Sequence, residues 1–241
     1  MPHINRRRPN TRLQIVQLAA KCFIEDGYSK TSLSKLAKEL DLSTGNITFY
    51  FPTKEHLLAV LVNEMFDFQN ILMDQAAEEG KSSLLAYCLE LTAMTSACEE
   101  SDVARDFYSA CYTSPLTLEL IRANDTQKTQ EVFSEYRRDW DGQQWVATEN
   151  IVSGIEYATI MTREENTPLT LQIEKTLDTI LYLYGVPREL RVQKIGKVLG
   201  MDYRALGKRL LREFREYIEK VNEEALENSM KMAQGRKRSE S

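Results

Sequence analysis

Apolar side chains recur at helical spacing along most of the chain. From Thr11, the residues Leu13, Val16, Ala20 and Phe23 return every three or four positions, which is the spacing of one face of an amphipathic helix. The same pattern predicts further helices that begin near residues 31, 44, 57, 82, 102, 115, 143, 168, 187 and 202. The chain is therefore predicted to have an all-α fold.

Short breaks divide the first sixty residues into three helices. Gly27 ends the first helix, because glycine readily takes the left-handed backbone conformation of a helix C-terminus. Asp41 and Leu42 leave room for only a sharp turn between the second helix and the third, which Ser43 caps and Pro52 ends. Two short helices joined by so tight a turn, after a packing helix, are typical of a helix-turn-helix.

The predicted third helix, residues 44–51, is small and polar at its start and aromatic at its end. A helix that only filled a core would not begin with Thr44, Gly45 and Asn46. A helix that lies against DNA would, since Gly45 allows close approach and the side chains of Thr44, Asn46 and Thr48 form hydrogen bonds.

The segment TSLSKLAKELDLSTGNITFYFPTKEHLL, residues 31–58, resembles the DNA-binding signature of the TetR family of transcriptional regulators. The resemblance covers about residues 10–60 and departs from the family pattern at Leu40, Asp41 and Thr48. Asp41 is compatible with the turn because aspartate tolerates left-handed backbone geometry, whereas Thr48 changes a customary DNA-contact position. The resemblance implies a first domain, residues 1–53, that binds double-stranded DNA.

Charge is distributed in a way that favours the same function. Residues 1–60 carry nine Lys and Arg against five Asp and Glu, a net charge of +4, while the remainder of the chain carries −9. A basic first quarter on an acidic body is typical of a module that binds a polyanion. Residues 1–9 are predicted to form a basic arm.

Ten residues are the predicted DNA contacts. Lys54 indicates a phosphate partner, because a cation at a helix start is unfavourable unless an anion binds there too. We interpret Tyr50 as a phosphate contact and Phe51 as core, although the three aromatic residues at 49–51 could all serve packing. The predicted contacts are Thr31, Ser32, Ser43, Thr44, Gly45, Asn46, Thr48, Phe49, Tyr50 and Lys54.

The resemblance implies that a larger helical domain, residues 54–229, binds a ligand and forms a dimer. Two helices near the C-terminus usually pair with their symmetry mates in this family, and residues 143–161 and 169–184 are the best candidates. Their small and aliphatic side chains suit a flat two-fold interface, although both helices could instead be ordinary core. The predicted interface residues are Ile151, Ile155, Ile173, Leu177 and Ile180.

Four tyrosines lie in the middle helices where the family's pocket is expected: Tyr87, Tyr108, Tyr112 and Tyr157. An aromatic ring with a polar tip suits a small hydrophobic ligand, although tyrosines at helical spacing also line cores. The region contains no histidine, and its sequence shows no carboxylate cluster. We therefore expect no metal sensor and no cofactor.

Composition argues against an enzyme. The two histidines of the chain, His3 and His56, are too few for a zinc site with these cysteines. A nucleophilic triad would need one of them, and both lie in segments that are better explained otherwise. The four cysteines form no CxxC pair, so buried free thiols are expected. No stretch approaches the ~20 apolar residues of a membrane span. No apolar run follows the basic start, so a signal peptide is not expected. These features predict a cytoplasmic protein without a membrane partner, ending in a disordered tail at 230–241.

The leading hypothesis is a homodimeric transcriptional repressor that binds a palindromic DNA operator and is released by a small hydrophobic ligand. The alternative is a DNA-bound adaptor of the same fold that recruits a protein partner and has no small-molecule inducer. A closed cavity lined by tyrosines would favour the first hypothesis, and a filled core with an exposed apolar patch would favour the second.

Overall fold

Helices account for all the regular secondary structure of this computed structural model in the residues that it describes, 11–77, 83–162 and 167–221. The predicted all-α fold is thereby confirmed. In chain order the elements are α1 (Thr11–Cys22), the π-helix η1 (Phe23–Gly27), α2 (Leu33–Glu39), α3 (Thr44–Tyr50), α4 (Lys54–Ala76), α5 (Leu84–Glu100), α6 (Asp102–Thr113), α7 (Pro115–Phe133), α8 (Gly142–Met161), α9 (Leu169–Leu183), α10 (Arg188–Leu199) and α11 (Tyr203–Lys220).

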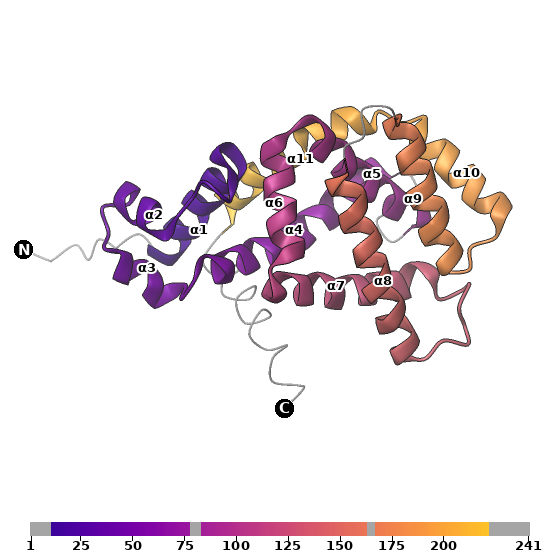
Figure 1. Ribbon diagram of the computed structural model, residues 1–241, viewed down its shortest axis with the longest axis horizontal. Helices are drawn as coiled ribbons and strands as arrows, with labels where there is room; N and C mark the ends of the chain where they lie inside the picture. Colours follow the sequence, from indigo (N-terminus) through magenta and orange to yellow (C-terminus); the bar gives the residue numbers. More distant parts are fainter. Residues whose placement is uncertain (1–10, 78–82, 163–166, 222–241) are drawn as a thin grey trace, which may run out of the picture.

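The helices form a small N-terminal unit, consisting of α1, η1, α2 and α3, and a larger helical body. Figure 1 shows α1–α3 at one end of an elongated molecule, with α4 running from them into the body. The long α4 buries Leu57, Leu58 and Leu61 completely, because it packs against other helices on most of its surface. None of the helices in the described part combines the length and apolar character that a membrane crossing requires.

Two left-handed residues shape the N-terminal unit. Gly27 has a φ of +105° and Asp41 a φ of 54°, as predicted for the ends of the first and second helices. The last turn of the first helix widens into η1, which the sequence pattern did not predict. Tyr28 then folds back, with its ring edge-on to Phe23 and the centroids 4.9 Å apart.

The C-terminal helix α11 braces the N-terminal unit against the body. Gly207 lies so close to α5 that a Cβ there would come within 2.8 Å of the Ala93 carbonyl oxygen, so only glycine permits this approach. Further along α11, the Gln17 amide of α1 donates to the Glu219 carbonyl at 3.2 Å, and Arg215 forms an ion pair with Glu25 of η1.

Two other expectations have clear outcomes. All four cysteines are buried and free, as predicted. The helix that begins at Pro115 ends at Phe133 rather than near residue 140, because Arg137 leaves the helical path and donates to the Leu183 carbonyl at the end of α9, at 2.7 Å. The basic arm at 1–9 and the tail at 230–241 lie outside the described residues, as does the expected end of the last helix.

Candidate DNA interface and ligand cavity

The outer face of α3 is polar and exposed. Ser43 caps the helix: its hydroxyl accepts the Asn46 N–H at 3.2 Å, and its own N–H donates to Asn46 Oδ1 at 3.3 Å. Ile47 is fully buried and fixes the helix to the N-terminal unit. Thr44 and Thr48 are exposed, as is Gly45 between them. This helix therefore presents small hydrogen-bonding groups on a rigid support.

The aromatic residues that end α3 divide between surface and core. Phe49 is 80% exposed, Tyr50 is half-buried with its ring edge-on to Phe49, and Phe51 is buried as predicted. An exposed phenylalanine beside small polar groups can make the apolar contact that a thymine methyl group offers in the major groove. Phe49 thus adds an exposed apolar side chain beside the polar face of α3.

Two of the predicted DNA contacts, Thr31 and Ser32, lie just before α2, and only Ser32 is exposed. Thr31 is buried, and its hydroxyl donates to the Gly27 carbonyl at 2.9 Å. This corrects the expectation of a DNA contact from Thr31, because its side chain is enclosed in the N-terminal unit. Ser32 is exposed and caps α2, with its hydroxyl accepting the Lys35 N–H at 3.1 Å.

The side chain of Lys54, at the start of α4, contacts residues of the N-terminal unit. Its ammonium donates to the carbonyl oxygens of Tyr28 and Thr31, both at 3.0 Å, and lies 3.8 Å from the centroid of the Tyr28 ring. Burial lowers the pKa of this ammonium, and the carbonyls and the ring compensate its charge. These partners explain a cation at this helix start without a phosphate. The predicted contact between Lys54 and a DNA phosphate therefore loses its main support.

A second contact joins the N-terminal unit to α6. Asp106 accepts the Ser29 N–H at 2.8 Å and also the Ser29 hydroxyl. The next two residues of α6, Phe107 and Tyr108, line a cavity in the body. Helix α6 therefore contacts the loop before α2 and also forms part of the cavity wall.

This cavity contains about 630 Å³ of space between atoms, counted to its open mouth, and lies among α4, α5, α6, α7 and α8. Three of the four predicted tyrosines line it, namely Tyr87, Tyr108 and Tyr112. The fourth does not: Tyr157 is half-buried, and its ring centroid lies 6.2 Å from that of Tyr112. Tyr157 is therefore removed from the set of cavity-lining residues.

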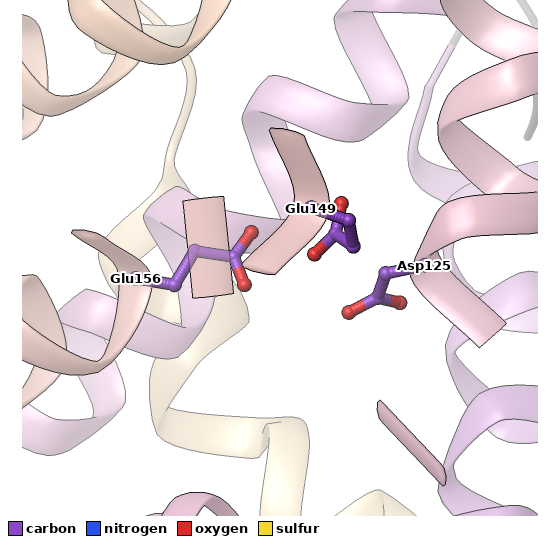
Figure 2. Close-up of side chains that lie close together, drawn as sticks. All are labelled: Asp125, Glu149 and Glu156. Carbon is purple, nitrogen blue, oxygen red and sulfur yellow. The ribbon is translucent and has the colours of Figure 1, made fainter. Parts of the chain in front are cut away.

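The structure also brings together a carboxylate cluster that the sequence reading excluded. Oxygen atoms of Asp125 from α7, and of Glu149 and Glu156 from α8, all lie within 4.8 Å of one another. Figure 2 shows the three carboxyl groups converging from the two helices. The expectation of no carboxylate cluster is wrong, because residues far apart in the sequence meet where the helices cross.

Tyrosine hydroxyls hold this cluster in place. Tyr87 and Tyr112 donate to the two oxygens of Glu156 at 3.3 and 3.1 Å, and Tyr184 donates to Glu149 Oε2 at 2.9 Å. Two of the predicted ligand tyrosines are therefore positioned by a carboxyl group. Acidic residues buried in this way are uncommon without a cation.

Burial raises the pKa of all three carboxyl groups. It raises the pKa of Asp125 to about 6, against the opposing charge of Lys128. Burial and the charge of Asp125 raise the pKa of Glu156 to about 8, and burial with the same charge raises the pKa of Glu149 further in the same direction. Strongly shifted groups beside a cavity are candidates for a functional site.

One sequence signal pointed to part of the cluster. Glu149 and Glu156 are seven residues apart, so they lie on one face of α8, and that face also carries the buried Trp145, Val152 and Ile160. Two acidic residues inside an apolar stripe are an anomaly in the sequence, because acidic side chains are rarely buried without a partner. Asp125 gave no comparable signal, because α7 has little amphipathic pattern in its sequence.

The predicted dimer residues divide between core and surface. Ile173, Leu177 and Ile180 of α9 are buried within their own chain. They have no area left to bury against a second copy, which corrects their assignment. On α8, Ile151 is 59% exposed and Ile155 is half-buried.

Further apolar residues extend this surface. Val146 of α8 and Leu171 and Tyr182 of α9 are also exposed. Together with Ile151, they place four of the seven exposed large apolar side chains of the described residues on α8 and α9.

The sequence shares segments with known regulators. The family model described as "Bacterial regulatory proteins, tetR family" matches residues 15–61. The chain is 30% identical over 153 residues to the fatty acid metabolism regulator protein of Bacillus subtilis (strain 168), which covers 63% of this chain and 73% of that protein. It is 38% identical over 82 residues to the uncharacterized HTH-type transcriptional regulator YuxN of the same organism, covering 33% of this chain but only 28% of that protein.

Two solved structures are similar in outline. The TetR family protein CprB from S. coelicolor A3(2) aligns with a TM-score of 0.44 and 20% identity, covering 85% of this chain and 100% of that chain. A gamma-butyrolactone receptor (ArpA-like protein) aligns with a TM-score of 0.39 and 20% identity, covering 84% of this chain and 97% of that chain.

Proposed function

The chain belongs to the TetR family of bacterial regulatory proteins, and on that premise we propose that it is a homodimeric repressor. It binds a palindromic DNA operator through the N-terminal unit of each copy, and a small molecule in the cavity of the body releases it. The observation that carries the DNA-binding part is the exposed face of α3, where Thr44, Thr48 and Phe49 stand on a helix anchored by the buried Ile47.

Thr48→Ala tests the role of α3 in reading DNA. We expect the variant to bind a duplex selected from random sequence about tenfold more weakly, because one specific base contact contributes ~1–3 kcal/mol. A repeated selection with the variant should return a sequence changed at one position of each half-site. Fluorescence anisotropy on the labelled duplex measures the affinity.

Thr113→Ala is the matched control for this experiment. Thr113 is an exposed threonine at the end of α6, outside the N-terminal unit, and its loss should leave the affinity unchanged. If Thr48→Ala and Thr113→Ala bind the selected duplex equally well, and as tightly as the natural sequence, α3 does not read the bases.

The outer faces of α8 and α9 are the proposed dimer interface. Ile151→Glu should place a carboxylate in the buried centre of that contact, with a cost on the order of a few kcal/mol. We expect a folded monomer in sedimentation experiments at a concentration where the natural sequence is a dimer.

Val192→Glu provides the comparison for the dimer test. Val192, on α10, is 63% exposed and lies outside the proposed contact, so its charged variant should remain dimeric. A dimeric Ile151→Glu variant would move the interface to another surface.

The cavity supports a ligand-responsive regulator over the adaptor hypothesis. Phe107 and Tyr108 line the cavity, and Asp106 beside them holds Ser29 of the N-terminal unit. A ligand that shifts α6 would therefore shift the N-terminal unit as well. A coupling of ~1–3 kcal/mol between the two sites would change DNA affinity about 5- to 150-fold.

A further inference from the structure

The cavity has an excess of acidic side chains. Of the four acidic and basic side chains that line it, Lys128 pairs with Glu90, which leaves Asp125 and Glu156. Neither of these forms an ion pair with any residue in the described part of the chain, and Glu149 adds a third carboxyl group behind them. Buried acidic groups normally have a cationic partner.

Two further polar groups at this place lack a partner. The Tyr108 hydroxyl is buried with no hydrogen bond, on a residue that is 3% exposed and lines the cavity. Glu149 is 1% exposed, its Oε1 is buried without a partner, and an oxygen of its carboxyl group lies within 4.8 Å of those of Asp125 and Glu156. Because buried polar groups are almost always hydrogen-bonded, the site is incomplete as it stands.

The remaining walls are apolar. Side chains from α4, α5 and α6 supply most of them, whereas the unpaired carboxyl groups come from α7 and α8. The cavity is thus acidic on one side and apolar on the other. The apolar side chains of α4, α5 and α6 include Val62, Met65, Phe66, Leu91, Met94 and Phe107, beside the amide of Gln69, and Ile121 of α7 adds to them.

We propose that the cavity binds an amphipathic organic cation, whose ammonium group lies against Asp125 and Glu156 and whose apolar chain lies against α4, α5 and α6. This names the ligand class of the regulatory site, and so its effect on DNA rests on the proposed function. A bare metal ion fits less well, because both oxygens of Glu156 already accept tyrosine hydroxyls and the walls on the other side of the cavity are mainly apolar.

Protons are expected to leave the site as the cation enters. With a pKa of about 8, Glu156 holds its proton near neutral pH, whereas Asp125, with a pKa of about 6, holds one only in more acidic solution. An adjacent ammonium favours the ionised forms of both groups. Affinity for the cation should therefore increase as the pH rises from about 6 to about 8. The charged and titratable groups that face the site are Glu90, Tyr87, Tyr112, Arg122, Lys128, Glu149 and Tyr184.

Isothermal titration calorimetry of the full chain with three probes of equal length tests the proposal. The probes are n-decylamine and decanoate, each below its critical micelle concentration, and n-decanol, below its solubility limit. We expect n-decylamine to bind at least about tenfold more tightly than the other two, since a charge-assisted hydrogen bond is stronger than a neutral one. Its heat should depend on the ionisation enthalpy of the buffer, because protons are released.

Variants then assign the binding to the cluster. Glu156→Gln and Asp125→Asn should each weaken n-decylamine about tenfold or more and leave n-decanol unchanged, with folding checked by circular dichroism. Glu131→Gln, at an exposed position of the same helix as Asp125, should bind n-decylamine as the natural sequence does. The proposal fails if n-decanol binds as tightly as n-decylamine, if neither cluster variant changes the affinity, or if Mn²⁺ alone binds and blocks n-decylamine.

The test of the cation site and the test of the proposed function have distinguishable outcomes. The affinity for the selected duplex is measured with and without n-decylamine. Binding of n-decylamine without any change in DNA affinity would support the cation site and contradict ligand-controlled release. DNA binding by a chain that takes up no n-decylamine would overturn the cation site alone.

Discussion

Glu156→Gln is expected to stabilise the protein against unfolding as the pH is raised. In the folded chain, burial and the charge of Asp125 raise the pKa of Glu156 from 4.5 to about 8, whereas the unfolded chain keeps an ordinary value. Between these two values the unfolded state loses the proton first, so the free energy of unfolding falls as the pH rises. Glutamine has a similar shape and no proton to lose, so this fall is absent from the variant.

The expected gain is large for a single substitution. Each unit of pKa shift corresponds to about 1.4 kcal/mol, so the variant should be more stable by a few kcal/mol near pH 8 and nearly equal near pH 4.5. Part of the gain comes from Glu149, because removing the charge of Glu156 lowers the pKa of Glu149.

Urea unfolding followed by circular dichroism, at one protein concentration and several pH values, measures this difference. The curves for Glu156→Gln and the natural sequence should separate with rising pH, while the exposed control Glu131→Gln follows the natural sequence. A Glu156→Gln variant that is less stable across the whole range would mean that Glu156 is ionised and favourably held by its tyrosine partners.

Leu177→Glu is expected to prevent the body from folding, rather than to separate a dimer. Leu177 is 0% exposed within a single chain. Loss of a buried leucine costs roughly 2–5 kcal/mol, and a carboxyl group without a partner in the same place costs on the order of a few more. The sum is comparable to the ~5–15 kcal/mol that stabilises a typical domain.

Far-UV circular dichroism and solubility distinguish this result from that of Ile151→Glu. Leu177→Glu should lose helical signal and aggregate, whereas Ile151→Glu should stay folded as a monomer. A soluble, fully helical and monomeric Leu177→Glu variant would restore the assignment made from the sequence pattern.

Features set by neighbouring residues could be predicted from the sequence. The turns at Gly27 and Asp41 and the cap at Ser43 depend on the backbone preferences of one or two residues. Each was placed correctly, because the local chemistry that fixes them is visible in the sequence.

Features set by tertiary contacts could not be predicted in the same way. The apolar stripe of α9 indicates a buried face, but the same stripe could be covered by its own chain or by a second copy. Lys54 was interpreted from its position on a helix, whereas its partners are carbonyl groups 23 and 26 residues earlier in the chain. The carboxylate cluster needs α7 and α8 to cross at one particular point.

During synthesis, the contacts by which α11 braces the N-terminal unit form late, because α11 lies near the end of the chain. The amide of Gln17 and the carbonyl of Glu219 are 202 residues apart, and translation at roughly 5–20 residues per second needs about ten to forty seconds to connect them. Over that interval the N-terminal helices have been made, but the surface that fixes them to the body has not. We therefore expect a nascent chain to hold its DNA-binding helices loosely and to become a competent regulator only after α11 has emerged and packed around Gly207.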